Sequence, residues 1–201
     1  MARNTQPKSK APAKKAKAEA PLPPASAYFM EERHDRTERH TLSVVVDNEP
    51  GVLARVIGLF SGRGYNIDSL TVSETEHAAH VSRITIVTTG QATVIEQIKA
   101  QLSRMVPVHT VRDLTAEGGS LERELALVKV VGTGDQRNEA LRLAQVFRAG
   151  VIDANVDHFV FELTGKPAKV DQFIAIMGPL GLVEVCRTGI AATSASSSCV
   201  A

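Results

Sequence analysis

Aromatic residues and cysteines are scarce in this sequence of 201 residues. Aromatic side chains make up only 4% and tryptophan is absent, so the chain has little from which to build a stacking platform for single-stranded nucleic acid. Two cysteines, Cys186 and Cys199, cannot form the disulfide framework of a small secreted protein. We therefore expect a reducing compartment. We expect Cys186, in a predicted strand, to be buried as a small hydrophobic residue.

Long apolar runs and a strong charge of one sign are also missing. The longest uncharged, mostly apolar run covers residues 173–183, short of the roughly 18 residues that a membrane-spanning helix needs. Residues 1–20 carry a charge of +5, so the remainder carries −4 against the total of +1. A basic, duplex-binding face on the folded part is therefore not expected. We predict neither a nucleic-acid partner nor a membrane partner.

Residues 1–40 form a basic, proline-rich extension. They lack hydrophobic periodicity, so they cannot bury enough apolar surface to offset the entropy of ordering, and we predict disorder. No apolar core follows the charges, which excludes a secretory signal and favours a cytoplasmic location. An organellar transit peptide is the alternative, because the first 18 residues lack acids. The prolines and the excess of lysine over arginine count against it.

Residues 41–115 alternate between strand-like and helix-like patterns. Short β-branched or alternating runs predict strands, and apolar residues at helical spacing predict helices. Pro50 is expected in the first turn of the first helix, and Gly62 and Gly64 at its end. The predicted strands cover 41–46, 66–73, 81–89 and 106–114, with helices along Val52–Phe60 and Ile95–Met105.

The same order recurs in residues 121–192, after a polar linker at 115–120. Gly150 is expected to end the first helix of this second copy, and residues 193–201 to form a disordered tail. The strands are predicted at 125–131, 151–157, 159–164 and 182–187, with helices along Ala140–Phe147 and Val170–Met177. The fold class is therefore α+β, with two tandem ferredoxin-like βαββαβ modules. Each leaves a sheet face and sheet edges open, which predicts an oligomer.

Constellations typical of catalysis are sparse. His77 and His80 are spaced as a metal pair, but no third ligand follows at zinc spacing, so we predict no metal site and no catalytic residue. Residues 61–64 resemble a glycine loop but follow a helix, so the context for binding phosphate is missing. Residues 132–134 are interpreted as a tight turn between strand and helix.

The most informative segment is the first strand-to-helix turn, residues 48–53. Backbone N–H groups at a helix start bind carboxylates readily. Gly51 has no Cβ, so a ligand can approach the backbone, and the Asn48 amide can accept from an ammonium and donate to a carboxylate. Such a turn suits a free amino acid. The alternative is an ordinary turn, because asparagine, proline and glycine are common turn residues.

Residues 47–73, DNEPGVLARVIGLFSGRGYNIDSLTVS, closely resemble the first module, an ACT domain, of the regulatory small subunits of bacterial acetolactate synthase. The resemblance covers roughly residues 40–192. It continues through 82–86, 123–130, 146–165 and 183–192. The basic extension and the ending TSASSSCVA depart from the family pattern.

The resemblance implies a non-catalytic subunit that activates a thiamine-diphosphate-dependent catalytic subunit in valine, leucine and isoleucine synthesis. Thiamine diphosphate, Mg and FAD are expected on that partner and no cofactor on this chain. Feedback inhibition by valine or another branched-chain amino acid is implied, with the effector between the ACT modules of a homodimer. The implied effector residues are Asn48, Gly51, Val52 and Leu53 of one subunit, with Asn66 and Ile67 of its partner. The second module lacks the Asn-x-Pro-Gly turn and is expected to dimerise or to touch the catalytic subunit.

Three other functions fit the sequence less well. A stand-alone ACT-type sensor that regulates transcription needs a DNA-binding element, and residues 1–40 contain no helix-turn-helix pattern. An RNA-binding ferredoxin-like module needs aromatic residues on its central strands. An acylphosphatase-like enzyme needs an arginine and an asparagine facing a phosphate loop, and Arg83 and Asn66 have no such loop. Candidate contacts with the catalytic subunit are Arg55, Arg63 and Arg123.

Overall fold

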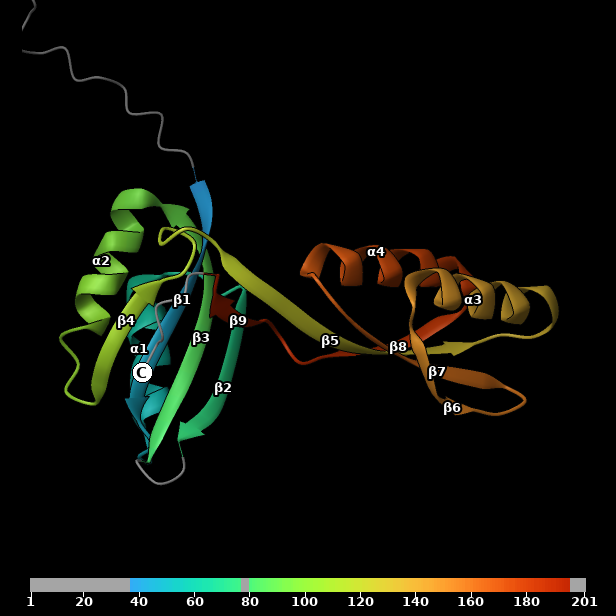
Figure 1. Ribbon diagram of the computed structural model, residues 1–201, viewed down its shortest axis with the longest axis horizontal. Coiled ribbons are helices and arrows are strands. Elements are labelled where there is room, and N and C mark those ends of the chain that lie inside the picture. Colours follow the sequence, from blue (N-terminus) through green and yellow to red (C-terminus); the bar gives the residue numbers. More distant parts are fainter. Residues whose placement is uncertain (1–36, 77–79, 196–201) are drawn as a thin grey trace, which may run out of the picture. The chain divides into compact units, whose positions relative to one another are not determined.

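The first module is an antiparallel sheet with two helices. The computed structural model describes residues 37–76 and 80–195. The strands in this module are β1 (Thr37–Asp47), β2 (Ser69–Glu76), β3 (Val81–Gln91) and β4 (Val108–Asp113), and the helices are α1 (Val52–Arg63) and α2 (Ala92–Leu102) (Figure 1). The strand order is β2-β3-β1-β4, which leaves β2 at one edge. This is the predicted ferredoxin-like path.

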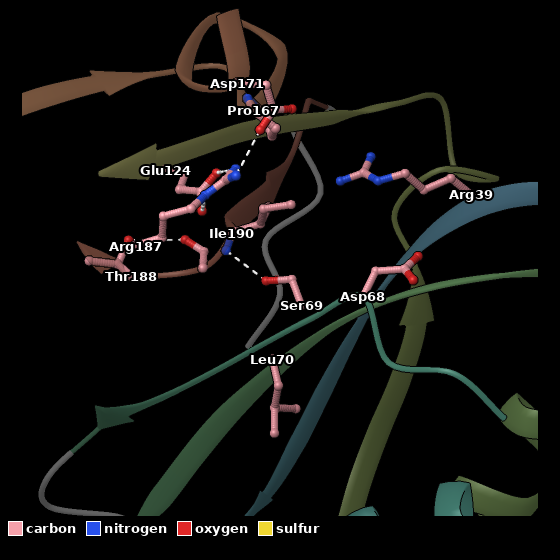
Figure 2. Close-up of a pocket in the computed structure, with 11 residues that line it drawn as sticks. Arg39, Asp68, Ser69, Leu70, Glu124, Pro167, Asp171, Arg187, Thr188 and Ile190 are labelled. Carbon is pink, nitrogen blue, oxygen red and sulfur yellow. Dashed lines mark hydrogen bonds and ion pairs between the residues drawn. The ribbon is translucent and has the colours of Figure 1, made fainter. Parts of the chain in front are cut away.

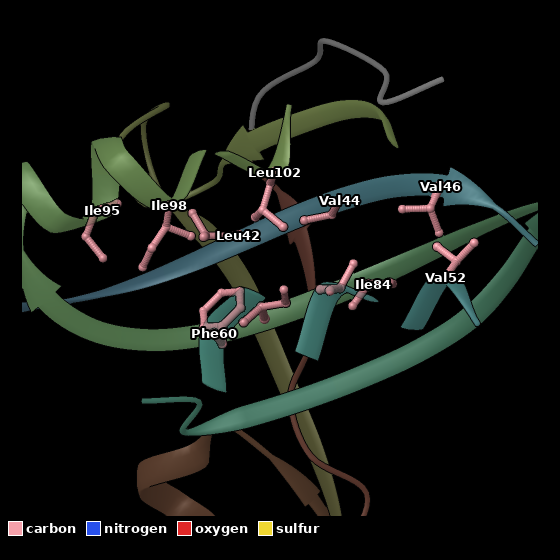
Figure 3. Packing of buried hydrophobic residues seen from close by; sticks show 11 residues of the cluster. Leu42, Val44, Val46, Val52, Phe60, Ile84, Ile95, Ile98 and Leu102 are labelled. Carbon is pink, nitrogen blue, oxygen red and sulfur yellow. The ribbon is translucent and has the colours of Figure 1, made fainter. Parts of the chain in front are cut away.

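The core of this module lies between the sheet and its helices. Alternate residues of β1 and β3 point to this side, and both helices contribute apolar stripes at helical spacing (Figure 3). Full burial of each such aliphatic or aromatic side chain contributes about 1.5–3 kcal/mol. The buried cluster consists of Leu42, Val44, Val46, Val52, Val56, Phe60, Ile84, Ile86, Ile95, Ile98 and Leu102.

The second module repeats the arrangement. Its elements are β5 (Ser120–Val131), α3 (Gly134–Phe147), β6 (Gly150–Ala154), β7 (His158–Gly165), α4 (Pro167–Met177), the 3₁₀ turn η1 (Gly178–Leu180), β8 (Leu182–Arg187) and β9 (Ala191–Ser194). The order β6-β7-β5-β8 matches that of the first sheet, and β9 pairs with the start of β5. Phe161 and Phe173 pack edge to face in the core, with their ring centroids 6.2 Å apart. Within the described residues, no helix is long and apolar enough to cross a membrane.

The first strand is longer than predicted. Residues 37–40, which we assigned to the disordered extension, belong to β1 and pair with residues 88–91 of β3. Their polar side chains gave no apolar signal, but two of them have acidic partners elsewhere in the chain. Arg39 pairs with Glu122, and His40 contacts Asp113 at 2.8 Å. The rest of the extension, residues 1–36, lies outside the described residues.

The second module also extends beyond its predicted bounds. β5 begins at Ser120, inside the predicted linker, and β9 covers two residues of the tail that we predicted to be disordered. The two segments pair with each other, from Ser120 with Ser194 to Arg123 with Ala191. These segments, SLER and AATS, contain serine, alanine and charged residues that carry little strand signal, so this pairing could not be predicted from local pattern. Residues 196–201 lie outside the described residues.

Several element ends differ from the prediction in detail. Gly64 caps α1 in a left-handed conformation, as predicted, but Gly62 lies inside that helix and Pro50 in the turn before it. β2 begins at Ser69, so Asn66 and Ile67 precede the strand. The end of α3 was also predicted wrongly. Its C-cap is Arg148 at φ 58°, and Gly150 is the first residue of β6.

The left-handed conformation of Arg148 gives a stability prediction. A non-glycine residue in this region is strained, because its Cβ crowds the backbone. After allowance for the extra freedom of glycine in the unfolded chain, Arg148→Gly is expected to raise the free energy of unfolding by about 0.5–1 kcal/mol. Thermal unfolding should then show a Tm about 1–4 °C higher. Arg148→Ala is the control, because it removes the side chain and keeps the strain. An equal rise in Tm for both variants would contradict the explanation.

Candidate functional site

The turn between β1 and α1 presents an uncapped helix start. Gly51 is the N-cap, with φ 87°, and no side chain caps the helix. The backbone N–H of Asn48 donates to His80 O at 2.7 Å, which holds the turn against the start of β3. The first turn of α1 contains no acidic residue. The helix start therefore keeps backbone donors and a positive dipole end available to an anion.

Space is open beside this turn. A Cβ placed on Gly51 would meet no atom within 4 Å. The Asn48 side chain is exposed, and Leu53 is 37% exposed at the start of the helix. Val52 differs, because its side chain is 2% exposed and packs in the core. This residue can therefore meet a ligand only through its backbone, where its N–H donates to Glu49 O over a long 3.3 Å.

The other two predicted effector residues lie in the segment before β2. The Asn66 amide donates to Asp68 at 2.6 Å, and the Asn66 carbonyl accepts from the Thr88 hydroxyl at 2.6 Å. Ile67 is partly buried against the core. The segment is thus fixed against the C-terminal part of β3.

Within one chain these two groups lie at opposite ends of the sheet. Asn48 contacts His80, just before β3, and Asn66 contacts Thr88, near its end. Eight residues of extended strand span about 26 Å. One small molecule therefore cannot contact both groups of the same subunit.

The equivalent turn of the second module differs in charge. Gly134 has φ 58°, and a Cβ placed on it would also meet no atom within 4 Å, so the space resembles that at Gly51. However, Asp135 lies in the first turn of α3. Its negative charge lies near the positive end of the helix, which disfavours a second carboxylate there.

The remaining sequence expectations have mixed outcomes. His80 adopts φ 51° in the turn before β3, and His77 lies outside the described residues. No group of three or more histidine, cysteine, aspartate or glutamate side chains in residues 37–76 and 80–195 could hold a metal ion. The prediction for Cys186 is wrong, because it is exposed. It pairs with Leu127 across β8 and β5, on the sheet face away from the helices, where both line a cavity of about 250 Å³.

A charged cluster missed by the sequence analysis lines a cavity of about 560 Å³ (Figure 2). Arg187 forms two hydrogen bonds with the Glu124 carboxylate, at 2.7 and 2.5 Å, and a third with Asp171 at 2.7 Å. The hydrogen bond with Glu124 raises the pKa of Arg187, against the effect of burial, and the bond with Asp171 adds to the rise. The side chain of Glu124 is 3% exposed. Its charge is therefore held inside the protein by one arginine.

The sequence contains one signal for this cluster. Glu124 stands in phase with Ala126, Val128 and Val130, the residues of β5 that face the core. A charged residue in the apolar phase of a strand needs a partner, since an unpaired buried carboxylate is strongly unfavourable. Local pattern could not identify that partner. Arg187 is brought to Glu124 by the pairing of β8 with β5.

A second acidic residue, Glu122, accepts hydrogen bonds from Arg39 and from the hydroxyl groups of Thr41 and Ser120. Arg39 donates to both carboxylate oxygens, at 3.3 and 3.0 Å, and Thr41 donates at 2.5 Å. Burial alone would raise the pKa of Glu122, but the hydrogen bonds from Thr41 and Arg39 outweigh it and lower that pKa. Glu122 therefore stays ionised and neutralises Arg39.

Comparison with known proteins covers both modules. A family model for an AHAS small subunit-like ACT domain matches residues 42–110, and one for the small subunit of acetolactate synthase matches residues 123–196. The probable acetolactate synthase small subunit of Archaeoglobus fulgidus is 44% identical over 151 residues, which are 75% of this chain and 93% of that protein. The isozyme 3 small subunit of Escherichia coli is 43% identical over 157 residues, 78% and 95% of the two chains.

A solved structure extends the similarity to the fold. The crystal structure of the acetolactate synthase small subunit from Thermotoga maritima superposes with a TM-score of 0.72 at 36% identity. It covers 80% of this chain and 99% of that one. The fold and the matched families thus define a regulatory protein built on an ACT domain. The chain belongs to the acetolactate synthase small-subunit family, as the sequence resemblance implied, and is a regulatory subunit with a catalytic large subunit as its partner.

Proposed function

We propose that this chain activates the catalytic subunit of acetolactate synthase and makes it sensitive to feedback inhibition by valine or another branched-chain amino acid. The observation that carries the proposal is the start of α1. Its backbone donors are uncapped, open space adjoins Gly51, and the first turn contains no acid. A free amino acid fits these surroundings, because its carboxylate would accept from the helix start while the exposed Asn48 amide meets its ammonium.

A homodimer would complete the effector site. β2 is an edge strand, so a second copy can pair with it. In a two-fold antiparallel pairing, the start of one β2 lies at the end of the other. The Asn66 and Ile67 of a second copy would then approach the end of the sheet that holds Gly51. The Gly51 turn and the Asn66–Ile67 segment are far apart within one chain. In this dimer, the turn of one chain and the segment of the other would form one shared site.

Valine would act by stabilising one dimer arrangement over another. It can shift the catalytic subunit only to the extent that it binds the two arrangements with different affinity. A coupling free energy of about 1–3 kcal/mol is typical of such linkage. Thiamine diphosphate, Mg and FAD belong to the catalytic subunit in this proposal, and the complex acts in the cytoplasm.

The second module is expected to contribute no amino-acid site. Asp135 would repel a ligand carboxylate from the start of α3, where α1 has no comparable charge. Calorimetric titration of the full chain with valine should therefore give one site per chain. Two sites of similar affinity would contradict this assignment.

The decisive experiment measures acetolactate formation by the catalytic subunit, with and without this chain, across a valine titration. Activation that valine reverses is expected. Activation without sensitivity to valine would support the catalytic subunit as the partner and refute valine as the effector. No activation would favour the stand-alone amino-acid sensor with another partner.

A further inference from the structure

A second cavity, of about 280 Å³, adjoins the charged cluster of Arg187, and Arg39 and Pro167 line both cavities. The larger cavity is lined by three acidic residues and two arginines. Arg187 holds Glu124 and Asp171, and Asp68 accepts from Asn66 and Thr89. Both arginines have carboxylate partners and the surplus charge is negative, so the larger cavity offers no free cation to an anionic ligand.

The smaller cavity has a surplus of positive charge. Arg39, Arg123 and Lys166 reach it from three different segments, namely β1, β5 and the start of α4. Its one acidic lining residue is Glu122, whose carboxylate is neutralised by Arg39 and also accepts from Ser120 at 3.2 Å. The charges of Arg123 and Lys166 are therefore not balanced by any acidic residue that lines this cavity.

These two cations lack carboxylate partners in the described part of the chain. The guanidinium of Arg123 donates to the backbone carbonyl of Glu122 at 2.8 Å and forms no ion pair there, and neither does Lys166. Most exposed lysine and arginine side chains are simply solvated. Here, however, both line the same cavity, and its single acid is already satisfied.

Two further features favour an anion. Lys166 is the N-cap of α4 and Pro167 its first residue, and the first turn holds no acid, so the positive end of this helix lies at the cavity. The Thr115 hydroxyl oxygen accepts from the backbone N–H of Thr41 at 3.1 Å, which leaves its proton free to donate.

We propose that the cavity lined by Arg39, Arg123 and Lys166 binds a small phosphate-bearing anion. A phosphate group carries a charge of about −1.5 to −2 at neutral pH, which matches the two unpaired cations. Its several acceptor oxygens suit a guanidinium, an ammonium and a hydroxyl together. None of these residues belongs to the Gly51 turn, so this site is separate from the amino-acid site and does not depend on it.

Calorimetric titration of the full chain with inorganic phosphate and with pyrophosphate, at fixed ionic strength, tests the proposal. Each lost charge-assisted contact is expected to weaken binding by about tenfold, so R123Q/K166Q should weaken it by about a hundredfold. The matched control is R104Q/K169Q, which removes the same charges from residues that do not line the cavity. Lys169 lies in the same helix turn as Pro167. The control should bind both anions as the unmodified chain does.

Two results would overturn the proposal. The first is no binding of either anion to the unmodified chain. If R123Q/K166Q then also associates more weakly with the catalytic subunit, the two cations recognise acidic side chains of that subunit. The second is equal weakening in the control, which would show that net charge alone attracts the anion.

Discussion

Replacing Gly51 with aspartate is expected to abolish inhibition by valine while activation of the catalytic subunit is retained. The new carboxylate would stand at the uncapped start of α1 and accept from the N–H groups that the ligand needs. Two carboxylates about 4 Å apart repel by about 4 kcal/mol in a partly solvated setting. With a discount for exposure, valine affinity should fall at least about a hundredfold. Valine titrations of the holoenzyme and calorimetry of the free chain both measure this loss.

Two control variants separate charge from strain and position. Asparagine is nearly the same size as aspartate and is strained in the same left-handed backbone, but it adds no charge. Gly51→Asn should therefore lower valine affinity by less than about tenfold. Gly134→Asp places the same carboxylate at the corresponding glycine of the second module, also with positive φ and open space. It should leave valine inhibition unchanged. Wild-type sensitivity in Gly51→Asp, or equal losses in Gly51→Asp and Gly134→Asp, would refute the site.

Local patterns predicted the order of elements because each module is built on simple periodicities. Leu42, Val44 and Val46 alternate along β1, and Val52, Val56 and Phe60 follow one face of α1. Both signals come from burial on a single side of the element. The start of α1 could also be predicted, since asparagine, proline and glycine precede an apolar stripe. That no side chain caps this helix start could be learned only from the structure.

Features that depend on distant polar residues could not be predicted in this way. The first residues of β1 owe their place to pairing with β3 and to contacts of Arg39 and His40 with Glu122 and Asp113. The pairing of β9 with β5 likewise joins segments about 70 residues apart, and neither segment has a run of β-branched or aromatic residues that would mark a strand. The predicted burial of Cys186 was wrong, since a short strand-like run does not show which of its residues face the covered side of the sheet.

The pairing of Glu124 with Arg187 gives the largest expected effect on stability. Arg187→Met would leave the buried Glu124 carboxylate without its two hydrogen bonds from the guanidinium. Removing one partner of a buried pair typically costs about 3–5 kcal/mol. The lower end applies, because Arg187 is itself 37% exposed and its loss admits water to Glu124. Urea unfolding should show a loss of about 3 kcal/mol, and thermal unfolding a fall in Tm of about 6–12 °C.

Two further variants test whether the unpaired carboxylate is the cause. Asp171→Asn removes the exposed partner of Arg187, and should cost less than about 1 kcal/mol, as for other exposed ion pairs. Glu124→Met combined with Arg187→Met removes both charges and replaces them with apolar side chains. Because no charge is then left unpaired in the interior, this double variant should be more stable than Arg187→Met alone. A double variant as unstable as the single one would show that the guanidinium stabilises β5 and β8 by packing, and that its charge contributes little.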